Sequence, residues 1–127
     1  MSQTLGLEQP DTLNTCLGLA TILMHEGRYE EAVKLAKQVQ ETNRHARGER
    51  DAITATATYT LARINARQGR ADASFSLLQE SIDTGLAPNL KGQMDRDPDL
   101  RSLHGDARWS SLLANAEQHA SASQKIN

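Results

Sequence analysis

Apolar residues along the chain recur at three- and four-residue steps, which is the period of an amphipathic helix. Four such stripes follow one another, and they are separated by Gly27, by a polar stretch at residues 43–50 and by Gly69. Glycine supplies the left-handed backbone conformation that commonly ends a helix. The pattern therefore predicts an all-α protein with two antiparallel helical hairpins, at about residues 11–47 and 51–85.

The remainder of the chain predicts shorter helices. Asp97-Pro98 offers an N-cap followed by proline at the first helical position, and Trp109 lies on the apolar side of a last helix. We expect short capping helices over about residues 88–119, so that residues 11–119 form a single domain. The ends of the chain, residues 1–10 and 120–127, are expected to be flexible tails.

A repeated motif links the two predicted hairpins. The order Leu-Ala, six residues and then Gly-Arg occurs twice at an offset of 42 residues, as Leu19-Ala20 with Gly27-Arg28 and as Leu61-Ala62 with Gly69-Arg70. A recurring helix–turn–helix unit has an apolar face that it cannot bury alone, so it stacks on a neighbouring unit. The small residue lets the two helices of a hairpin approach closely, and the glycine reverses the chain.

These residues resemble the tetratricopeptide repeat family, which places a small residue late in its first helix, glycine before the turn, an aromatic after it and alanine early in its second helix. The matching positions are Leu19, Ala20, Leu23, Gly27, Tyr29 and Ala32 in the first copy and Leu61, Ala62, Gly69 and Leu78 in the second. The second copy departs at Ala71 and Ser74, and the 42-residue offset exceeds the usual period of about 34 residues. A longer helix or loop around residues 42–50 would absorb the difference.

The C-terminal segment is similar to the ending of tetratricopeptide-like segments in many bacterial multi-domain proteins. The similarity lies in Asp97-Pro98-Asp99-Leu100, Leu103, Gly105-Asp106, Arg108-Trp109 and Leu112-Leu113. It implies a bacterial source and a capping role for this segment.

Composition excludes several classes of function. The chain has 127 residues, a net charge of -2 and a pI near 6.1, so neither nucleic acid nor a membrane is an expected partner. Its single cysteine, Cys16, rules out an intrachain disulfide. No apolar run is long enough to span a membrane, and the first ten residues lack the features of a signal peptide. We therefore expect a cytoplasmic protein.

Candidate chemistry is sparse. Asp95, Asp97 and Asp99 alternate as in a calcium loop, but Leu100 stands where such a loop needs glycine, so helix capping is the simpler interpretation. The four histidines lack metal-binding spacing, and Cys16 lies on an apolar stripe without a neighbouring base. The sequence thus predicts no catalytic residues, no metal and no cofactor.

The resemblance also implies a binding groove, because the first helix of each tetratricopeptide hairpin lines a concave face. The residues assigned to that groove are Asn14, Leu17, Thr21, Met24 and His25 from the first copy and Tyr59, Arg63 and Arg67 from the second. Aromatic residues and arginine often dominate binding energy, although two arginines four residues apart could equally be a solvated helix face. Gly18 and His25 replace the Asn and Lys of the family's carboxylate clamp, so recognition of a chaperone C-terminus is not expected.

The resulting hypothesis is a non-catalytic adaptor that binds a protein or peptide partner, for which an acidic peptide is one candidate. A homo-oligomerisation module and an accessory subunit or fragment of a larger bacterial enzyme remain alternatives. A monomer is favoured, because the C-terminal helices can cover an open end of the array, but a homodimer is possible.

Overall fold

The computed structural model describes residues 9–85 and 94–126, with side chains described as far as Gln118. Its regular elements are α2 (Pro10–His25), α3 (Tyr29–Arg47), α4 (Ala52–Arg67), α5 (Ala71–Thr84), η1 (Met94–Arg96), η2 (Pro98–Leu103) and α7 (Ala107–Ile126). All of these are helices, which confirms the all-α prediction for this part of the chain. Apart from Met94, the short helix expected at residues 88–94 lies outside the described residues, as does most of the predicted N-terminal tail. The final helix continues beyond residue 119 to Ile126.

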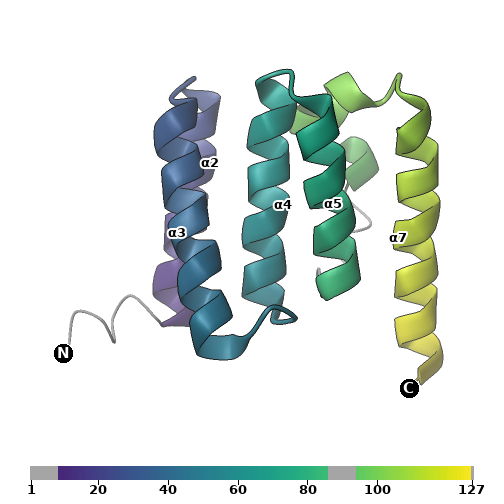
Figure 1. The fold of residues 1–127 in the computed structure, drawn as a ribbon, viewed down its shortest axis with the longest axis horizontal. Coiled ribbons are helices and arrows are strands. Elements are labelled where there is room, and N and C mark those ends of the chain that lie inside the picture. Colours follow the sequence, from purple (N-terminus) through teal and green to yellow (C-terminus); the bar gives the residue numbers. More distant parts are fainter. Residues whose placement is uncertain (1–8, 86–93, 127) are drawn as a thin grey trace.

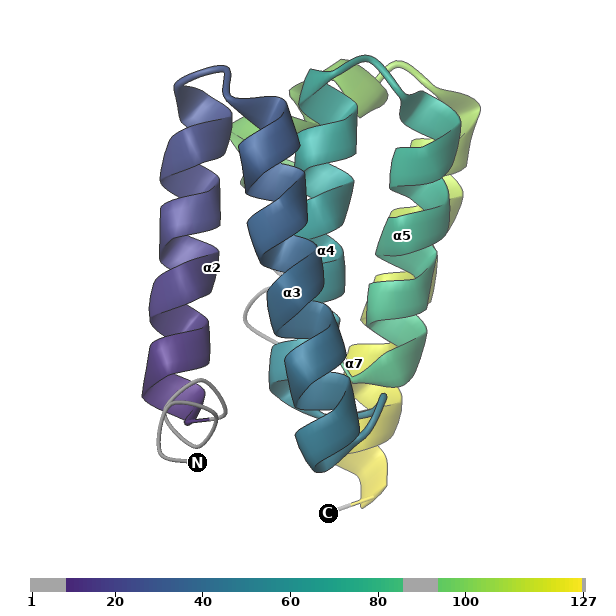
Figure 2. The same ribbon diagram turned by 60° about the vertical axis from the view of Figure 1, so that its left-hand side comes forward.

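The long helices stand side by side and alternate in direction (Figure 1). Helices α2 and α3 form the first hairpin, and α4, α5 and α7 follow beside it in chain order. The short helices η1 and η2 lie behind α4 and α5 in this view, on the side of α4 away from the viewer. Figure 2 shows the same row from the side of the first hairpin.

The two hairpin turns are built in the same way. Gly27 and Gly69 have φ angles of 82° and 80°, in the left-handed region that favours glycine. Each is followed by an arginine whose backbone N–H donates to a carbonyl five residues back, Arg28 to Leu23 and Arg70 to Asn65, both at 2.9 Å. Each glycine N–H also donates to a carbonyl three residues back, Gly27 to Met24 at 3.0 Å and Gly69 to Ala66 at 3.1 Å. The two bonds together form a Schellman motif, which uses carbonyls that the helix end would otherwise leave unpaired.

The extra length of the first repeat lies in α3, which runs five residues longer than α5 (19 against 14). A buried polar network holds that extension. The Asn43 amide nitrogen donates to Asp51 Oδ2 at 2.9 Å and to Thr54 Oγ1 at 2.8 Å, and its Oδ1 accepts from Arg47 at 2.8 Å. Asp51 also caps α4 by accepting from the Ile53 N–H. The polar stretch is therefore helix as far as Arg47, because its polar groups satisfy one another.

Two apolar clusters meet at α4, the most buried helix of the described chain. One lies between α4 and the first hairpin, and the other lies between α4, α5 and the C-terminal helices. Ser74, which stands where the family has alanine, is fully buried, and its hydroxyl donates to the Ala62 carbonyl at 2.8 Å. The substitution is therefore accommodated by a hydrogen bond at the helix crossing.

The C-terminal helices close the second hairpin. Trp109 is 5% exposed and packs in the same cluster as Phe75 and Leu78 of α5. At the edge of this contact the guanidinium of Arg108 lies 4.5 Å from the Phe75 ring centroid and forms an ion pair with Asp72 at 2.9 Å. Helix α7 thus takes the place that a third repeat would occupy, and it gives the second hairpin a covered face.

Candidate functional site

Two aspartates at the start of η2 are held in place by the turn that begins this helix. Asp97 is the N-cap residue, and its Oδ1 accepts a hydrogen bond from the backbone N–H of Asp99 at 2.9 Å. Pro98 occupies the first position of η2, where an N–H would have no partner in the helix. The turn presents both carboxylates to α4.

Three residues of α4 receive these carboxylates. They are four residues apart and therefore share one side of the helix. The Tyr59 hydroxyl donates to Asp97 Oδ2 at 2.5 Å, and Arg63 donates to Asp99 Oδ2 through Nη2 at 2.6 Å and Nε at 3.2 Å. Arg67 donates to the other oxygen, Asp99 Oδ1, at 2.9 Å. We call Tyr59, Arg63, Arg67, Asp97 and Asp99, together with His25, the acidic-turn cluster.

His25 connects this cluster to the first hairpin. Its Nε2 lies 3.1 Å from Asp99 Oδ1 and 3.3 Å from Oδ2. The Asp99 side chain is 2% exposed, whereas those of Arg63, Arg67 and His25 are 18%, 35% and 50% exposed. One buried carboxylate is therefore surrounded by nitrogen donors that become progressively more exposed.

The surroundings shift the pKa of two groups in the cluster. Burial alone would raise the pKa of the Asp99 carboxyl, but hydrogen bonding and attraction from Arg63, followed by His25, outweigh burial and leave that pKa below its ordinary value. Burial also raises the pKa of the Tyr59 hydroxyl, and the hydrogen bond to Asp97 raises it further. At neutral pH Asp99 is a carboxylate and Tyr59 is a protonated donor.

The repeated turns and the order of the helical hairpins are those of a known family of helical repeats. A tetratricopeptide repeat family model matches residues 9–84. The chain belongs to the tetratricopeptide repeat family. No curated protein and no solved structure matches it closely enough to indicate an individual relative.

The eight residues assigned to the tetratricopeptide groove fall into three groups. The structure brings His25, Tyr59, Arg63 and Arg67 together, but around carboxylates of the chain itself. Leu17 and Met24 point into the core between the hairpins, at 5% and 0% exposure. Asn14 is exposed and Thr21 is half-buried.

The apolar part of the expected groove is therefore absent from the surface. Leu17 and Met24 belong to the stripe that packs α2 against α3 and α4, as do Leu13 and Ala20. The concave side of α2 lies about 100° around the helix from this stripe, because each of its residues follows a stripe residue by one position and successive residues are about 100° apart. That side carries Asn14, Gly18, Thr21 and His25, which we call the α2 strip.

Gly18 lies in the middle of the α2 strip and has a normal helical backbone. A methyl group at this position would meet no other atom within 4 Å. Glycine inside a helix costs about 1 kcal/mol relative to alanine, and no internal contact of the structure requires it here. Its effect is to leave the helix backbone open to close approach from outside.

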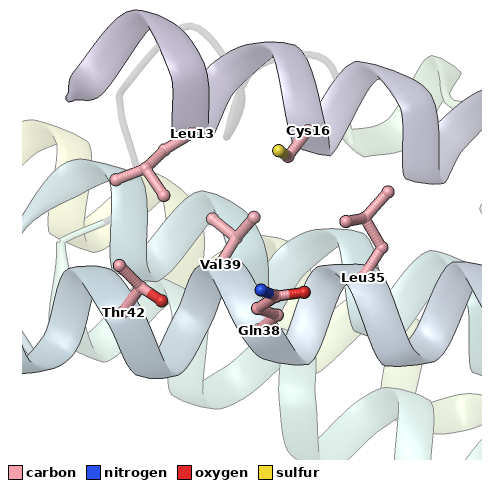
Figure 3. Close-up of a pocket in the computed structure, with 6 residues that line it drawn as sticks. All are labelled: Leu13, Cys16, Leu35, Gln38, Val39 and Thr42. Atoms are coloured by element: carbon pink, nitrogen blue, oxygen red, sulfur yellow. The ribbon is translucent and has the colours of Figure 1, made fainter. Parts of the chain in front are cut away.

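A small pocket opens on the opposite side of α2, between this helix and α3 (Figure 3). Its volume is about 180 Å³. Leu13, Cys16, Leu35 and Val39 give it an apolar lining, and Gln38 and Thr42 stand at its α3 side. Since typical small-molecule sites have about 300–1,000 Å³, this pocket has room for a side chain of a neighbour rather than for a cofactor. No grouping of acidic, cysteine and histidine residues suited to a metal occurs among the described side chains.

The sequence pattern predicts Asp97 as a helix cap, which the structure confirms, but it does not predict the contact of Asp99 with Arg63. The contact joins residues 36 positions apart, so neither helical period nor local capping could predict it. A usable clue was present in the turn Asp97-Pro98-Asp99, because it supplies one more carboxylate than a cap requires.

Proposed function

We propose that this tetratricopeptide protein is a non-catalytic adaptor that binds a protein or peptide partner along the α2 strip. The observation that carries the proposal is the contrast between the two concave helices. On α4 the arginines are already paired with Asp97 and Asp99, while on α2 the equivalent side is open around Gly18. Protein binding is the usual role of the family, which supports an interaction function in general.

The chemistry of the α2 strip suits an extended peptide. Asn14 can donate to and accept from a peptide backbone, and Gly18 allows that backbone to come close to the helix. Thr21 donates its hydroxyl to the Leu17 carbonyl at 3.1 Å, which leaves its oxygen available as an acceptor. His25, whose Nε2 already contacts the Asp99 carboxylate, lies at the C-terminal end of the strip.

The experiment is a capture of partners from the source cell with the chain as bait, followed by calorimetry with the purified partner. We expect Gly18→Leu to weaken binding by about tenfold, as is typical when a central contact is blocked. Ala46→Leu is the matched control, because it adds the same side chain at an exposed position of α3. A partner that binds Gly18→Leu as tightly as the parent does not use the α2 strip.

The homo-oligomerisation alternative is favoured by a different feature. Leu19 is 49% exposed and lies one turn beyond Cys16, a residue that lines the small pocket between α2 and α3. A second copy could cover this open edge of the first hairpin. Light scattering over a range of concentrations distinguishes the two functions: we expect a monomer, and a dimer that Leu19→Glu dissociates would support the oligomerisation module. Cytoplasmic location and a bacterial source are further expectations of the same proposal.

A further inference from the structure

A second hollow lies between α3 and α5, with α4 as its floor. Its volume is about 500 Å³. Leu61 of α4 forms the apolar bottom, and Val33 of α3 and Leu77 of α5 face each other across it. Both side chains are half-buried. We call this hollow the α3–α5 groove.

The α3–α5 groove lies on the side of α4 opposite the acidic-turn cluster. Leu61 and Asn65 line the groove, whereas Arg63 points to Asp99. On a helix with about 100° per residue, Leu61 and Asn65 are each about 160° around the axis from Arg63. The groove is therefore separate from the α2 strip, and the two proposed surfaces can fail independently.

The charges around the groove are unbalanced. Lys37, Arg44 and Arg70 stand on its rim, and Glu80 is the one carboxylate that lines it. Arg44 is already paired with Glu41 along α3. Within residues 9–85 and 94–118, no carboxylate forms an ion pair with Lys37 or Arg70, in contrast to the neutralised arginines of the acidic-turn cluster.

We propose that the α3–α5 groove binds a helix of a partner protein that carries aliphatic side chains with a carboxylate one turn away. The groove is bounded by two helices whose facing residues are three and four positions apart, and a third helix can lay its own ridge of side chains between them. An aliphatic side chain would contact Leu61 and Leu77. A carboxylate one turn to either side of it would lie nearer to Lys37 or to Arg70, whose positive charges favour it.

The chemistry of the lining argues against nucleic acid as the occupant. None of the described residues that line the groove is aromatic, so these residues offer no stacking surface for a base. Lys37 and Arg70 have no carboxylate partner among the described side chains, and together with the apolar floor they complement a mixed surface better than a phosphate backbone. The net charge of the chain is -2. A protein helix with both characters is the ligand that matches.

The test uses the full chain and a defined probe. The probe is a lactam-bridged helical peptide in which Leu and Glu occupy one face a turn apart, and the comparator has Gln in place of each Glu. Binding is followed by amide chemical shifts of the isotope-labelled protein. We expect the shifts to concentrate at Val33, Lys37 and Leu77, and the comparator to bind about five- to tenfold more weakly because it lacks the charged contacts.

The double variant Lys37→Glu with Arg70→Glu should weaken the acidic probe by at least the same factor. The matched control is Arg96→Glu with Arg101→Glu, which makes the same change in charge at two exposed arginines that line no part of the groove. The control should stay within about twofold of the parent, because long-range effects are screened by salt. An unchanged helical circular dichroism spectrum and Trp109 emission verify that both variants are folded.

Four results would overturn the proposal. The first three are equal binding of the acidic and the amide peptide, shifts that map to Thr21 and His25 instead of the groove, and no binding at millimolar peptide. If the groove residues shift with protein concentration in the absence of peptide, the occupant is a second copy of this chain, and the choice of a partner helix is wrong.

Discussion

The substitution Asp99→Asn tests whether the acidic-turn cluster holds the C-terminal segment against both hairpins. Asparagine has nearly the same shape as aspartate but no charge, and one of its two polar atoms is a donor. Asp99 presents one oxygen to Arg63 and the other to Arg67 and His25. In either orientation of the amide, its NH₂ group would face a cation that is itself a donor.

The magnitude follows from the exposure of each partner. The Arg63 side chain is 18% exposed, so its charged hydrogen bonds to Asp99 are nearly as strong as fully buried ones. Losing them costs about 2–3 kcal/mol of unfolding free energy. Arg67 and His25 are 35% and 50% exposed, so each contributes on the scale of a surface pair, about 0.5 kcal/mol. The expected loss is therefore about 3 kcal/mol of unfolding free energy, which for a chain of 127 residues lowers Tm by roughly 12 °C.

Urea unfolding monitored by circular dichroism measures this loss, and Glu117→Gln serves as the control. Glu117 is exposed on α7, and it forms no ion pair with any described side chain, so the same change of carboxylate to amide should shift stability by less than about 0.5 kcal/mol. A loss for Asp99→Asn that is no larger than the control would refute the reasoning. A double-mutant cycle with Arg63→Gln should also give a coupling of about 1.5 kcal/mol or more if the two side chains act as a pair.

Three further predictions concern pH, the capping helix and a close backbone contact. Because the pKa of Asp99 is lowered in the folded protein, the stability that this carboxylate contributes is complete above the unfolded pKa of about 3.9 and is lost as pH falls through the folded pKa. In urea titrations, the stability difference between the parent and Asp99→Asn should thus be constant from pH 7 to about 5 and shrink towards pH 3. Trp109→Ala should cost about 3–5 kcal/mol, and native Trp109 emission should be blue-shifted; an emission maximum of hydrated indole would contradict its buried position. Gly85→Ala should destabilise the protein by about 2 kcal/mol or more, since φ is 127° and the new Cβ would lie 2.6 Å from the Arg50 carbonyl oxygen. Gly27→Ala, with φ of 82° and open space, should cost only the left-handed strain of about 1–2 kcal/mol. Equal melting temperatures for the two variants would show that the Arg50 contact does not matter.

The helices are predictable from the sequence because they depend on interactions between residues close together in the chain. The apolar period and the glycine turns act within a few residues, so the hairpins with Gly27 and Gly69 between their helices follow directly from the order of residues. Asp51 was recognisable as a cap for the same reason. The helical structure of the polar stretch after Asn43 could not be predicted in this way, because it depends on the buried network that joins α3 to Asp51 and Thr54.

The candidate site was harder to predict because it depends on which side of a helix is covered. Leu17 and Met24 were assigned to an exposed groove, yet the same apolar character makes them core residues between α2, α3 and α4. Arg63 and Arg67 do share one side of α4, but whether that side faces a partner or the chain itself is decided by a segment 32–36 residues further along. Sequence period fixes the azimuth of a side chain, and only tertiary packing decides what it meets.

The ion pairs inside the acidic-turn cluster limit the places where an acidic partner can bind. The two arginines of α4 have the residue type and spacing of a carboxylate-binding surface, and the structure shows that Asp99 already provides that carboxylate from within the chain. An external acidic ligand at Arg63 would have to displace a buried carboxylate that accepts several charged hydrogen bonds, which is costly. Replacing Arg63 and Arg67 by acidic residues would place negative charge beside Asp99 and destabilise the fold. Such variants therefore cannot separate an effect on binding from an effect on stability. Lys37 and Arg70, which form no ion pair with any described carboxylate, stand on the other side of α4. Recognition of acidic partners is therefore expected at the α3–α5 groove, while the α2 strip offers a mainly polar and sterically open surface.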